Sequence, residues 1–181
     1  AKDAQRREIL SKRTRTSRTF AKSGSLQTLI GAGTINYQDA SGNFQPIDNT
    51  LVPSAVAGYG FTNKANGYAV QLPGDLSKAP VCISTNAGSV AFALAGASGV
   101  ASVSGSSASF GTVLPGVSLS YTASNEVVRE DLSLASAAAP SDFSFQVQLS
   151  PGLTAASNKG GGIDFIDASG KTAFSFRAPF M

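Results

Sequence analysis

Hydrophobic and polar residues alternate in short runs along most of the chain after residue 26, and Gly, Pro, Ser and Asn separate the runs. The clearest run is Phe143-Ser-Phe145-Gln-Val147-Gln-Leu149. A period of two places its four large apolar side chains on one face of a strand and its three polar ones on the other, so one face is expected to lie in a core. Helical periodicity is nearly missing, which favours an all-β protein.

The same alternation recurs in four more segments, with turn-forming residues about every ten positions. Half-buried strands at this spacing are typical of stacked antiparallel sheets. We therefore predict an all-β fold, an antiparallel β-sandwich with two stacked sheets. The Gly, Ser and Ala-rich stretch 95–109 is interpreted as a weak edge strand and not as a domain linker. The four segments are 90–94, 117–121, 128–134 and 174–176.

The tetrapeptide Asp-Ala-Ser-Gly occurs twice, at 39–42 and at 167–170. An Asp that accepts hydrogen bonds from the backbone amides ahead of it, followed by a Gly free to adopt positive φ, suits a type I turn with a bulge. Both segments are therefore predicted to be β-hairpins. Calcium binding is the alternative, but each turn offers too few carboxylates near one another.

Positive charge is concentrated in the first 22 residues. They hold eight of the fourteen basic residues and two acidic ones, a net charge of +6, whereas the rest has six basic and nine acidic residues, a net charge of −3. We therefore divide the chain into a basic N-terminal arm, 1–22, and a single β-sandwich-like domain, 23–181. The net positive charge of the whole chain therefore comes from the arm, and no nucleic-acid-binding face is predicted on the domain.

The arm is compatible with a short helix from Asp3 to Lys12, followed by an exposed edge strand or an extended tail. It could contact an anionic wall polymer or membrane phosphate, dock onto other domains of the same parent protein, or be a solvated tail. We favour the tail and docking interpretations. The chain begins at Ala1 without a signal-peptide pattern, and we expect a mature or excised fragment. No uncharged apolar run approaches the roughly 18 residues of a membrane helix, so a transmembrane protein is not expected.

Histidine is absent, which removes the commonest general base and the commonest transition-metal ligand. The single cysteine, Cys82, stands in the apolar run Val81-Cys82-Ile83, and we expect it to be a small buried side chain. Neither a metal nor a cofactor is predicted. A weak surface calcium site is the remaining alternative for metals.

Without histidine, the catalytic groups that remain are Ser–Lys pairs, carboxylate pairs or tyrosine, and the sequence favours none of them. Serines are so numerous that some will lie near a lysine by chance, and no Gly-x-Ser-x-Gly elbow joins a strand to a helix. Glu126, Glu130 and Asp131 form the obvious acidic cluster, but at most two would converge, and a solvated acidic face is the better interpretation. The run of glycines at 160–162 lacks the Lys and Ser or Thr of a phosphate-binding loop and is interpreted as a plain loop. The chain is therefore predicted not to be an enzyme.

Aromatic side chains are the candidates for ligand binding, because sugars stack on exposed rings. Tyr59 and Tyr68 flank a turn-rich stretch and are the weak candidates for a ligand-binding site. The competing interpretation makes these rings core or hairpin-pairing residues, and it is the favoured one.

Several sequence segments occur in order at 36–39, 42–52, 63–66, 114–117 with Tyr121, 164–167 with Gly170, and 178–181. Together they resemble the N-terminal β-module of large secreted RHS/YD-repeat and wall-associated proteins of Gram-positive bacteria, which often carry DNRLRE-type β-modules. The resemblance spans roughly residues 8–181 and brings no catalytic motif with it. It implies an extracellular or wall-associated setting, in which N-terminal modules serve anchoring, export or assembly of the β-shell that encloses a toxin. No YD repeat is present in the 181 residues.

Taken together, these patterns predict a non-catalytic structural or anchoring module of an exported or cell-surface RHS-repeat-type protein. Its expected partners are other domains of the same parent. A carbohydrate-binding or cell-wall-binding module, with cell-wall glycan or anionic wall polymer as its ligand, is the alternative.

Overall fold

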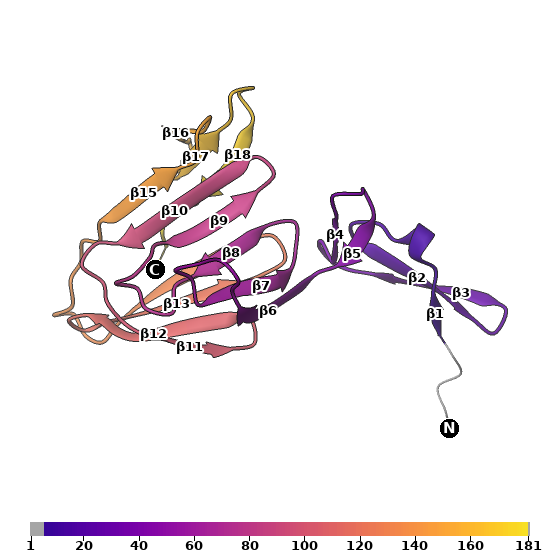
Figure 1. Ribbon diagram of the computed structural model, residues 1–181, viewed down its shortest axis with the longest axis horizontal. Helices are drawn as coiled ribbons and strands as arrows, with labels where there is room; N and C mark the ends of the chain where they lie inside the picture. The colour runs from indigo at the N-terminus through magenta and orange to yellow at the C-terminus, as the bar shows by residue number, and fades with distance from the viewer. Residues whose placement is uncertain (1–5, 181) are drawn as a thin grey trace.

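The computed structural model describes residues 6–180, and nearly all of its regular structure is β (Figure 1). The strands form two parts, an N-terminal unit at 6–47 and a sandwich at 48–180, which lie beside each other along the longest axis of the molecule. No helix among these described residues is long and apolar enough to cross a membrane.

The N-terminal unit contains two small antiparallel sheets. One has the order β1-β2-β3 and the other is the hairpin β4-β5. A short 3-10 helix at Leu10–Lys12 connects β1 to β2. The strands are β1 (Arg7–Glu8), β2 (Ser17–Lys22), β3 (Ser25–Ile30), β4 (Asn36–Gln38) and β5 (Phe44–Pro46).

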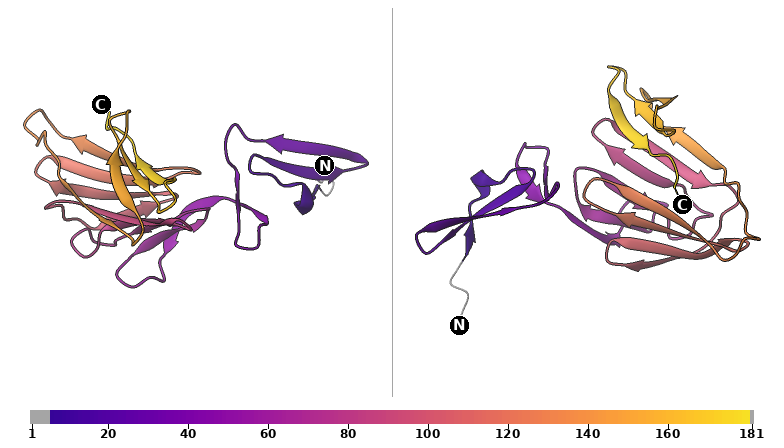
Figure 2. Two further views of the ribbon diagram at one scale, coloured as in Figure 1. Left: turned by 90° about the horizontal axis from the view of Figure 1, so that it is seen from above. Right: turned by 180° about the vertical axis from the view of Figure 1, so that it is seen from behind.

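The sandwich contains three further antiparallel sheets. The six-stranded sheet has the order β15-β10-β9-β8-β7-β6, the four-stranded sheet β11-β12-β13-β14, and the three-stranded sheet β16-β17-β18. Figures 1 and 2 show the four-stranded sheet stacked against the six-stranded one. The strands are β6 (Asp48–Pro53), β7 (Phe61–Ala65), β8 (Ala69–Leu72), β9 (Val81–Thr85), β10 (Gly88–Leu94), β11 (Ala101–Ser104), β12 (Ser107–Leu114), β13 (Val117–Ala123), β14 (Val128–Leu134), β15 (Phe145–Leu149), β16 (Thr154–Ser157), β17 (Ile163–Ile166) and β18 (Thr172–Phe176).

The core lies between these stacked sheets, and the alternating residues of the central strands fill it. In β13 every second residue is buried, from Val117 to Ala123, as the period of two requires. Phe92 of β10 meets Tyr121 of β13 edge to face, with ring centroids 6.2 Å apart. Phe92 also meets Phe176 of β18 at 5.2 Å, so one ring joins all three sheets. The prediction of an antiparallel all-β sandwich is confirmed.

Local predictions were confirmed at both Asp-Ala-Ser-Gly turns. Asp39 Oδ1 accepts hydrogen bonds from the amides of Ser41 (3.0 Å) and Asn43 (2.9 Å) within the β4-β5 hairpin. Asp167 Oδ1 does the same for Ser169 and Lys171 within β17-β18. Gly42 and Gly170 adopt φ of 82° and 84°, the left-handed region that other residues enter only with strain. These carboxylates are therefore turn acceptors.

The structure differs from the sequence prediction at the strand with the clearest alternation. Its inward face was expected to be core, yet β15 is the edge of the six-stranded sheet, and Phe145 and Val147 stay 37% and 40% exposed. Alternation specifies which face a residue joins, but it does not specify how far from the middle of the sheet the strand lies.

The division of the chain at residue 22 also differs from the observed pairing. β2 pairs with β3 from Ser17↔Ile30 to Lys22↔Ser25, so the boundary expected after residue 22 falls inside the turn of this hairpin. Most of the arm is ordered as β1, a 3-10 turn and β2, with β2 in the middle of its sheet and not at an edge. The helix expected from Asp3 to Lys12 is wrong in its described part: Arg7–Glu8 is strand β1, and Leu10–Lys12 forms a single 3-10 turn. Residues 3–5 of that range lie outside the described residues.

The position of Phe92 generates a stability prediction. Phe92→Ala removes a ring that is 6% exposed and contacts two other sheets, so it should lower the free energy of unfolding by about 3–5 kcal/mol. Val147→Ala is the matched control, because Val147 is the direct cross-strand partner of Phe92 on the edge strand. Its loss should stay below about 1.5 kcal/mol. Denaturant titration followed by fluorescence or circular dichroism measures both, and equal losses would contradict this description of the core.

Candidate functional site

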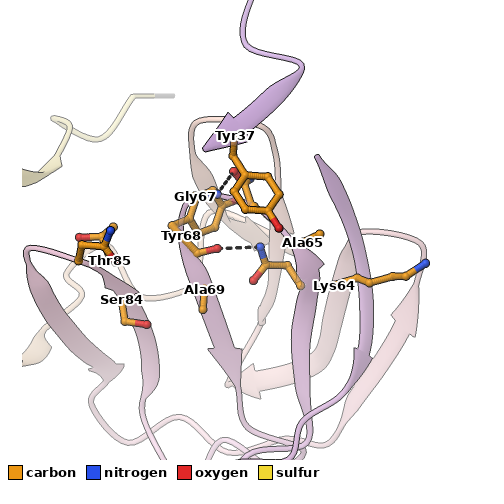
Figure 3. Close-up of a pocket in the computed structure, with 11 residues that line it drawn as sticks. Tyr37, Lys64, Ala65, Gly67, Tyr68, Ala69, Ser84 and Thr85 are labelled. Carbon is orange, nitrogen blue, oxygen red and sulfur yellow. Dashed lines mark hydrogen bonds between the residues drawn. The ribbon is translucent and has the colours of Figure 1, made fainter. Parts of the chain in front are cut away.

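An open groove of about 380 Å³ lies where the N-terminal unit meets the sandwich. Tyr37 of β4 forms one wall, and the β7-β8 hairpin together with the end of β9 forms the rest (Figure 3). The Tyr37 side chain lies over Gly67, and a Cβ atom at Gly67 would stand 3.6 Å from that of Tyr37. The groove therefore exists because two segments 30 positions apart in sequence come together at the hairpin.

The groove is polar because the hairpin opens at its tip. The two strands pair directly only at Phe61↔Leu72 and Thr62↔Gln71. Beyond that point the buried Asn63 side chain replaces the ladder: its Nδ2 donates to the Tyr68 carbonyl oxygen at 3.0 Å, and its Oδ1 accepts from the Val70 amide at 2.8 Å. Satisfied in this way, Asn63 can stay buried at little cost.

A chain of side-chain amides connects the hairpin tip to the N-terminal unit. Asn66 Nδ2 donates to Asn49 Oδ1 at 2.9 Å, and Asn49 Nδ2 donates to Asn125 Oδ1 at 2.9 Å. Asn125 Nδ2 then donates to the carbonyl oxygen of Thr34 at 2.6 Å, and the Thr34 hydroxyl donates to Glu126. We call these five residues the polar junction. They join segments of both parts of the chain.

Of the two predicted ligand-binding tyrosines, Tyr68 lines the groove but has a structural role. Its hydroxyl donates to the carbonyl oxygen of Ser124 at 2.5 Å, and burial raises the pKa of Tyr68 to about 12. The hydroxyl is thus turned towards the loop before β14. Tyr59 does not line the groove. It is half-buried beside Cys82, and burial raises its pKa.

Tyr37 also lines the groove, although nothing in the sequence distinguished it from the other tyrosines. Within residues 6–180 no hydrogen-bond partner meets its hydroxyl, and its half-buried ring faces the groove. Its local sequence, inside a hairpin, carries no mark of this role. The signal would have been the contact with Gly67, which depends on tertiary structure.

Each carboxylate of the predicted acidic cluster has a different structural partner. Glu126 accepts from Thr34, and Asp131 pairs with Arg129 at 2.8 Å on the surface. Glu130 Oε1 accepts a hydrogen bond from the Tyr121 hydroxyl at 2.6 Å, because the two residues are cross-strand partners on β14 and β13. The structure does not bring the three together around a common ligand. Among the described residues no three Asp, Glu, His or Cys side chains group as a metal site would require.

Burial at the core edge raises the pKa of Glu130, and the charge of Asp131 raises it further, although the Tyr121 hydrogen bond opposes both. The same burial and the neighbouring Glu130 raise the pKa of the Tyr121 hydroxyl. Hydrogen-bonded in this way, the pair satisfies two polar groups inside the sandwich.

Cys82 was expected to be buried, and this prediction was wrong. It lies on the outer face of β9, half-buried, and pairs in register with Ala91 and Gln71. Burial raises the pKa of its thiol, which therefore stays protonated at neutral pH. The period of two explains the difference, because Val81 takes the inward position.

The groove offers hydrogen-bonding groups but no activated nucleophile. Lys64, at its rim, lies 3.0 Å from Asp48, and the Thr50 hydroxyl together with Lys64 lowers the pKa of Asp48 to about 2. The ammonium group is therefore held in an ion pair. Ser84 and Thr85 add hydroxyl groups along β9. Such a surface suits a neutral, polyhydroxylated ligand laid against the Tyr37 ring.

Comparison with known proteins gives no match: no protein-family model, no curated protein and no solved structure is similar to this chain.

The Tyr121–Glu130 pair generates a pH prediction. Because the folded-state pKa of Glu130 is raised, its contribution to stability is present below the unfolded value of 4.5 and is lost as pH rises through the folded-state pKa. Glu130→Gln keeps an acceptor for Tyr121 but cannot ionise. The variant should therefore gain stability relative to wild type as pH rises from about 4 to 7.

Denaturant unfolding at a series of pH values measures that difference. Asp142→Asn is the control, since Asp142 is exposed and accepts a hydrogen bond from the hydroxyl of the neighbouring Ser141. If the difference in free energy of unfolding between Glu130→Gln and wild type were constant over the whole pH range, Glu130 would not have the raised pKa of a buried carboxyl group.

Proposed function

We propose that this chain is a non-catalytic structural module of a large exported or cell-surface protein of the RHS-repeat type. In this role the sandwich is a rigid body, and the N-terminal unit is a basic appendage held at a fixed position on it. The polar junction carries the proposal, because it joins the two parts through directed hydrogen bonds and not through a flexible linker.

The charge distribution supports the same role. Residues 6–47 contain seven basic and two acidic residues, a net charge of +5, whereas 48–180 contain six basic and eight acidic ones, a net charge of −2. Part of the basic charge serves the fold: Arg13 donates to Glu8 through Nε at 2.7 Å and Nη2 at 2.9 Å. The exposed remainder, such as Arg7 and Arg15, is available to other domains of a parent protein or to an anionic polymer.

Loss of the junction should release the N-terminal unit. Asn125→Ala removes the donor to the Thr34 carbonyl oxygen and the acceptor for Asn49, which leaves a part-buried carbonyl without its partner. Cleavage by trypsin after the exposed Arg15 should then be at least several-fold faster than in wild type, with the sandwich left intact. Asn86→Ala, at the groove but outside the junction, is the control. Equal cleavage rates in all three proteins would contradict a fixed arrangement.

Carbohydrate binding in the groove is the second candidate, and one observation favours it. The groove is polar, and its one ring with an unbonded hydroxyl among residues 6–180, Tyr37, faces the open space. Rings in this position stack on the apolar faces of sugars, while the polar groups around them form hydrogen bonds with the sugar hydroxyl groups.

A glycan array and a pull-down with purified cell walls distinguish the two candidates. The structural role predicts no saturable binding that depends on Tyr37. Carbohydrate binding predicts saturable binding that Tyr37→Ala weakens at least about tenfold and that Tyr59→Ala, outside the groove, leaves unchanged. Binding that falls steeply with salt and depends on Arg7 and Arg15 would instead indicate contact between the basic unit and an anionic polymer.

A further inference from the structure

The outer edge of β3 is unprotected. β3 pairs with β2 on one side, and no strand among residues 6–180 pairs with its other side. Its sequence, Ser-Leu-Gln-Thr-Leu-Ile, contains neither a charge nor a proline, and Leu26, Leu29 and Ile30 are 62%, 50% and 75% exposed. Edge strands normally carry charges or proline that prevent pairing with other chains. An uncharged, apolar edge in an otherwise basic unit therefore needs an explanation.

The N-terminal unit also lacks a core of its own. Its buried residues, Thr19, Thr34 and Asn36, are all polar. On the β3 side of its sheet, Leu26 and Ile30 share one face and are exposed in the single chain, so a strand added at this edge would bring its own side chains against them. Figures 1 and 2 show this sheet projecting away from the sandwich, so the sandwich does not cover the edge of β3.

The backbone of β3 shows which groups are free to pair. The Gly31 amide donates to the Thr16 carbonyl oxygen of the preceding segment, and the Ile9 amide donates to the Thr19 carbonyl oxygen from the other side. Backbone groups in antiparallel strands alternate in direction. In β3 the amides and carbonyls of Leu26, Thr28 and Ile30 therefore point outward, away from β2.

We propose that β3 pairs antiparallel with β3 of a second copy of this chain, about a two-fold axis at Thr28. A two-fold axis perpendicular to the sheet keeps each face on the same side, so paired residues must have the same parity. With the axis at Thr28, Leu26 of each copy faces Ile30 of the other. The three outward-pointing residues of each strand then meet those of its copy, and all their amides and carbonyls are paired.

Other registers fit less well. With the axis at Gln27, Leu26 would face Thr28 and Ile30 would face Gly24, which lies in the turn with φ of 81° and cannot extend the ladder. In the register at Thr28, Leu26 of each copy lies opposite Ile30 of the other, so the interface contains two such apolar pairs. This self-complementarity is what an isologous contact requires.

Electrostatics permit this partner although each unit carries +5. The charges next to β3 lie on β2, at Arg18 and Lys22. In the paired sheet each β2 lies three strand spacings from its copy, about 14 Å, which exceeds the Debye length of about 8 Å at physiological salt. Because β3 has no charged side chain, it offers no basic group that would favour an acidic partner strand. The proposal does not depend on the proposed function.

Disulfide trapping tests the register in the full chain with Cys82→Ser as background. Thr28→Cys places a thiol on the axis next to its copy, at a Cα separation of about 5.5 Å that a disulfide can span. It should form a covalent dimer under mild oxidation. Gln27→Cys, also at an exposed position on the same strand, lies on the opposite face and away from its copy, so its dimer should form at least tenfold more slowly. Equal rates for the two variants would overturn the proposal.

Sedimentation equilibrium of the unmodified chain tests the pairing itself. One strand pair is a small interface, so we expect a monomer–dimer equilibrium with a dissociation constant of about 1 μM to 1 mM. Thr28→Lys places two lysine ammonium groups opposite each other at the axis, and their repulsion should weaken dimerisation at least tenfold without changing the circular dichroism spectrum. A monomer at every concentration up to about 1 mM would overturn the proposal. So would assemblies that grow beyond two chains, since these require β3 to pair with another edge such as β15.

Discussion

The contact between Phe92 and Tyr121 is the interaction on which the rest of the structure depends. It joins β10, the second strand of the six-stranded sheet, to β13, an inner strand of the four-stranded sheet, and Phe176 attaches the third sheet to the Phe92 ring. Because Tyr121 is 1% exposed, its hydroxyl needs a partner inside the protein, and Glu130 supplies it from the neighbouring strand. An acidic residue thus occupies an inward position of β14, where the alternation by itself would place an apolar one.

The outer regions of the molecule obey a different constraint. Away from the core, polar side chains satisfy open backbone groups, as Asn63 does at the hairpin tip and Asn125 at Thr34. These directed bonds fix the position of the N-terminal unit, which has no hydrophobic core to dock with. The proposed function and the proposed pairing of β3 concern different parts of the N-terminal unit, the polar junction and the free edge of β3. One concerns how the unit is held, and the other concerns what its free edge can meet.

The sequence predicted what local rules decide and missed what depends on contacts between distant segments. The strands around Phe92 and Tyr121 and both Asp-Ala-Ser-Gly hairpins follow from periodicity and turn chemistry. The position of β15 at an edge, by contrast, depends on strand order, which alternation does not contain. Of the two tyrosines selected from the sequence, Tyr68 lines the groove and Tyr59 does not, and Tyr37 enters it through a contact with Gly67 that no local pattern marks. The family resemblance stays a prediction, because the comparisons match nothing.

If the polar junction holds the N-terminal unit in place, the two parts of the chain tumble in solution as one body. Measurement of ¹⁵N relaxation in dilute solution is the direct test, because rotational diffusion reports the size of the unit to which each amide belongs. We expect one rotational correlation time for the amides of 6–47 and of 48–180. A clearly shorter correlation time for the N-terminal unit would show that the polar junction does not hold it.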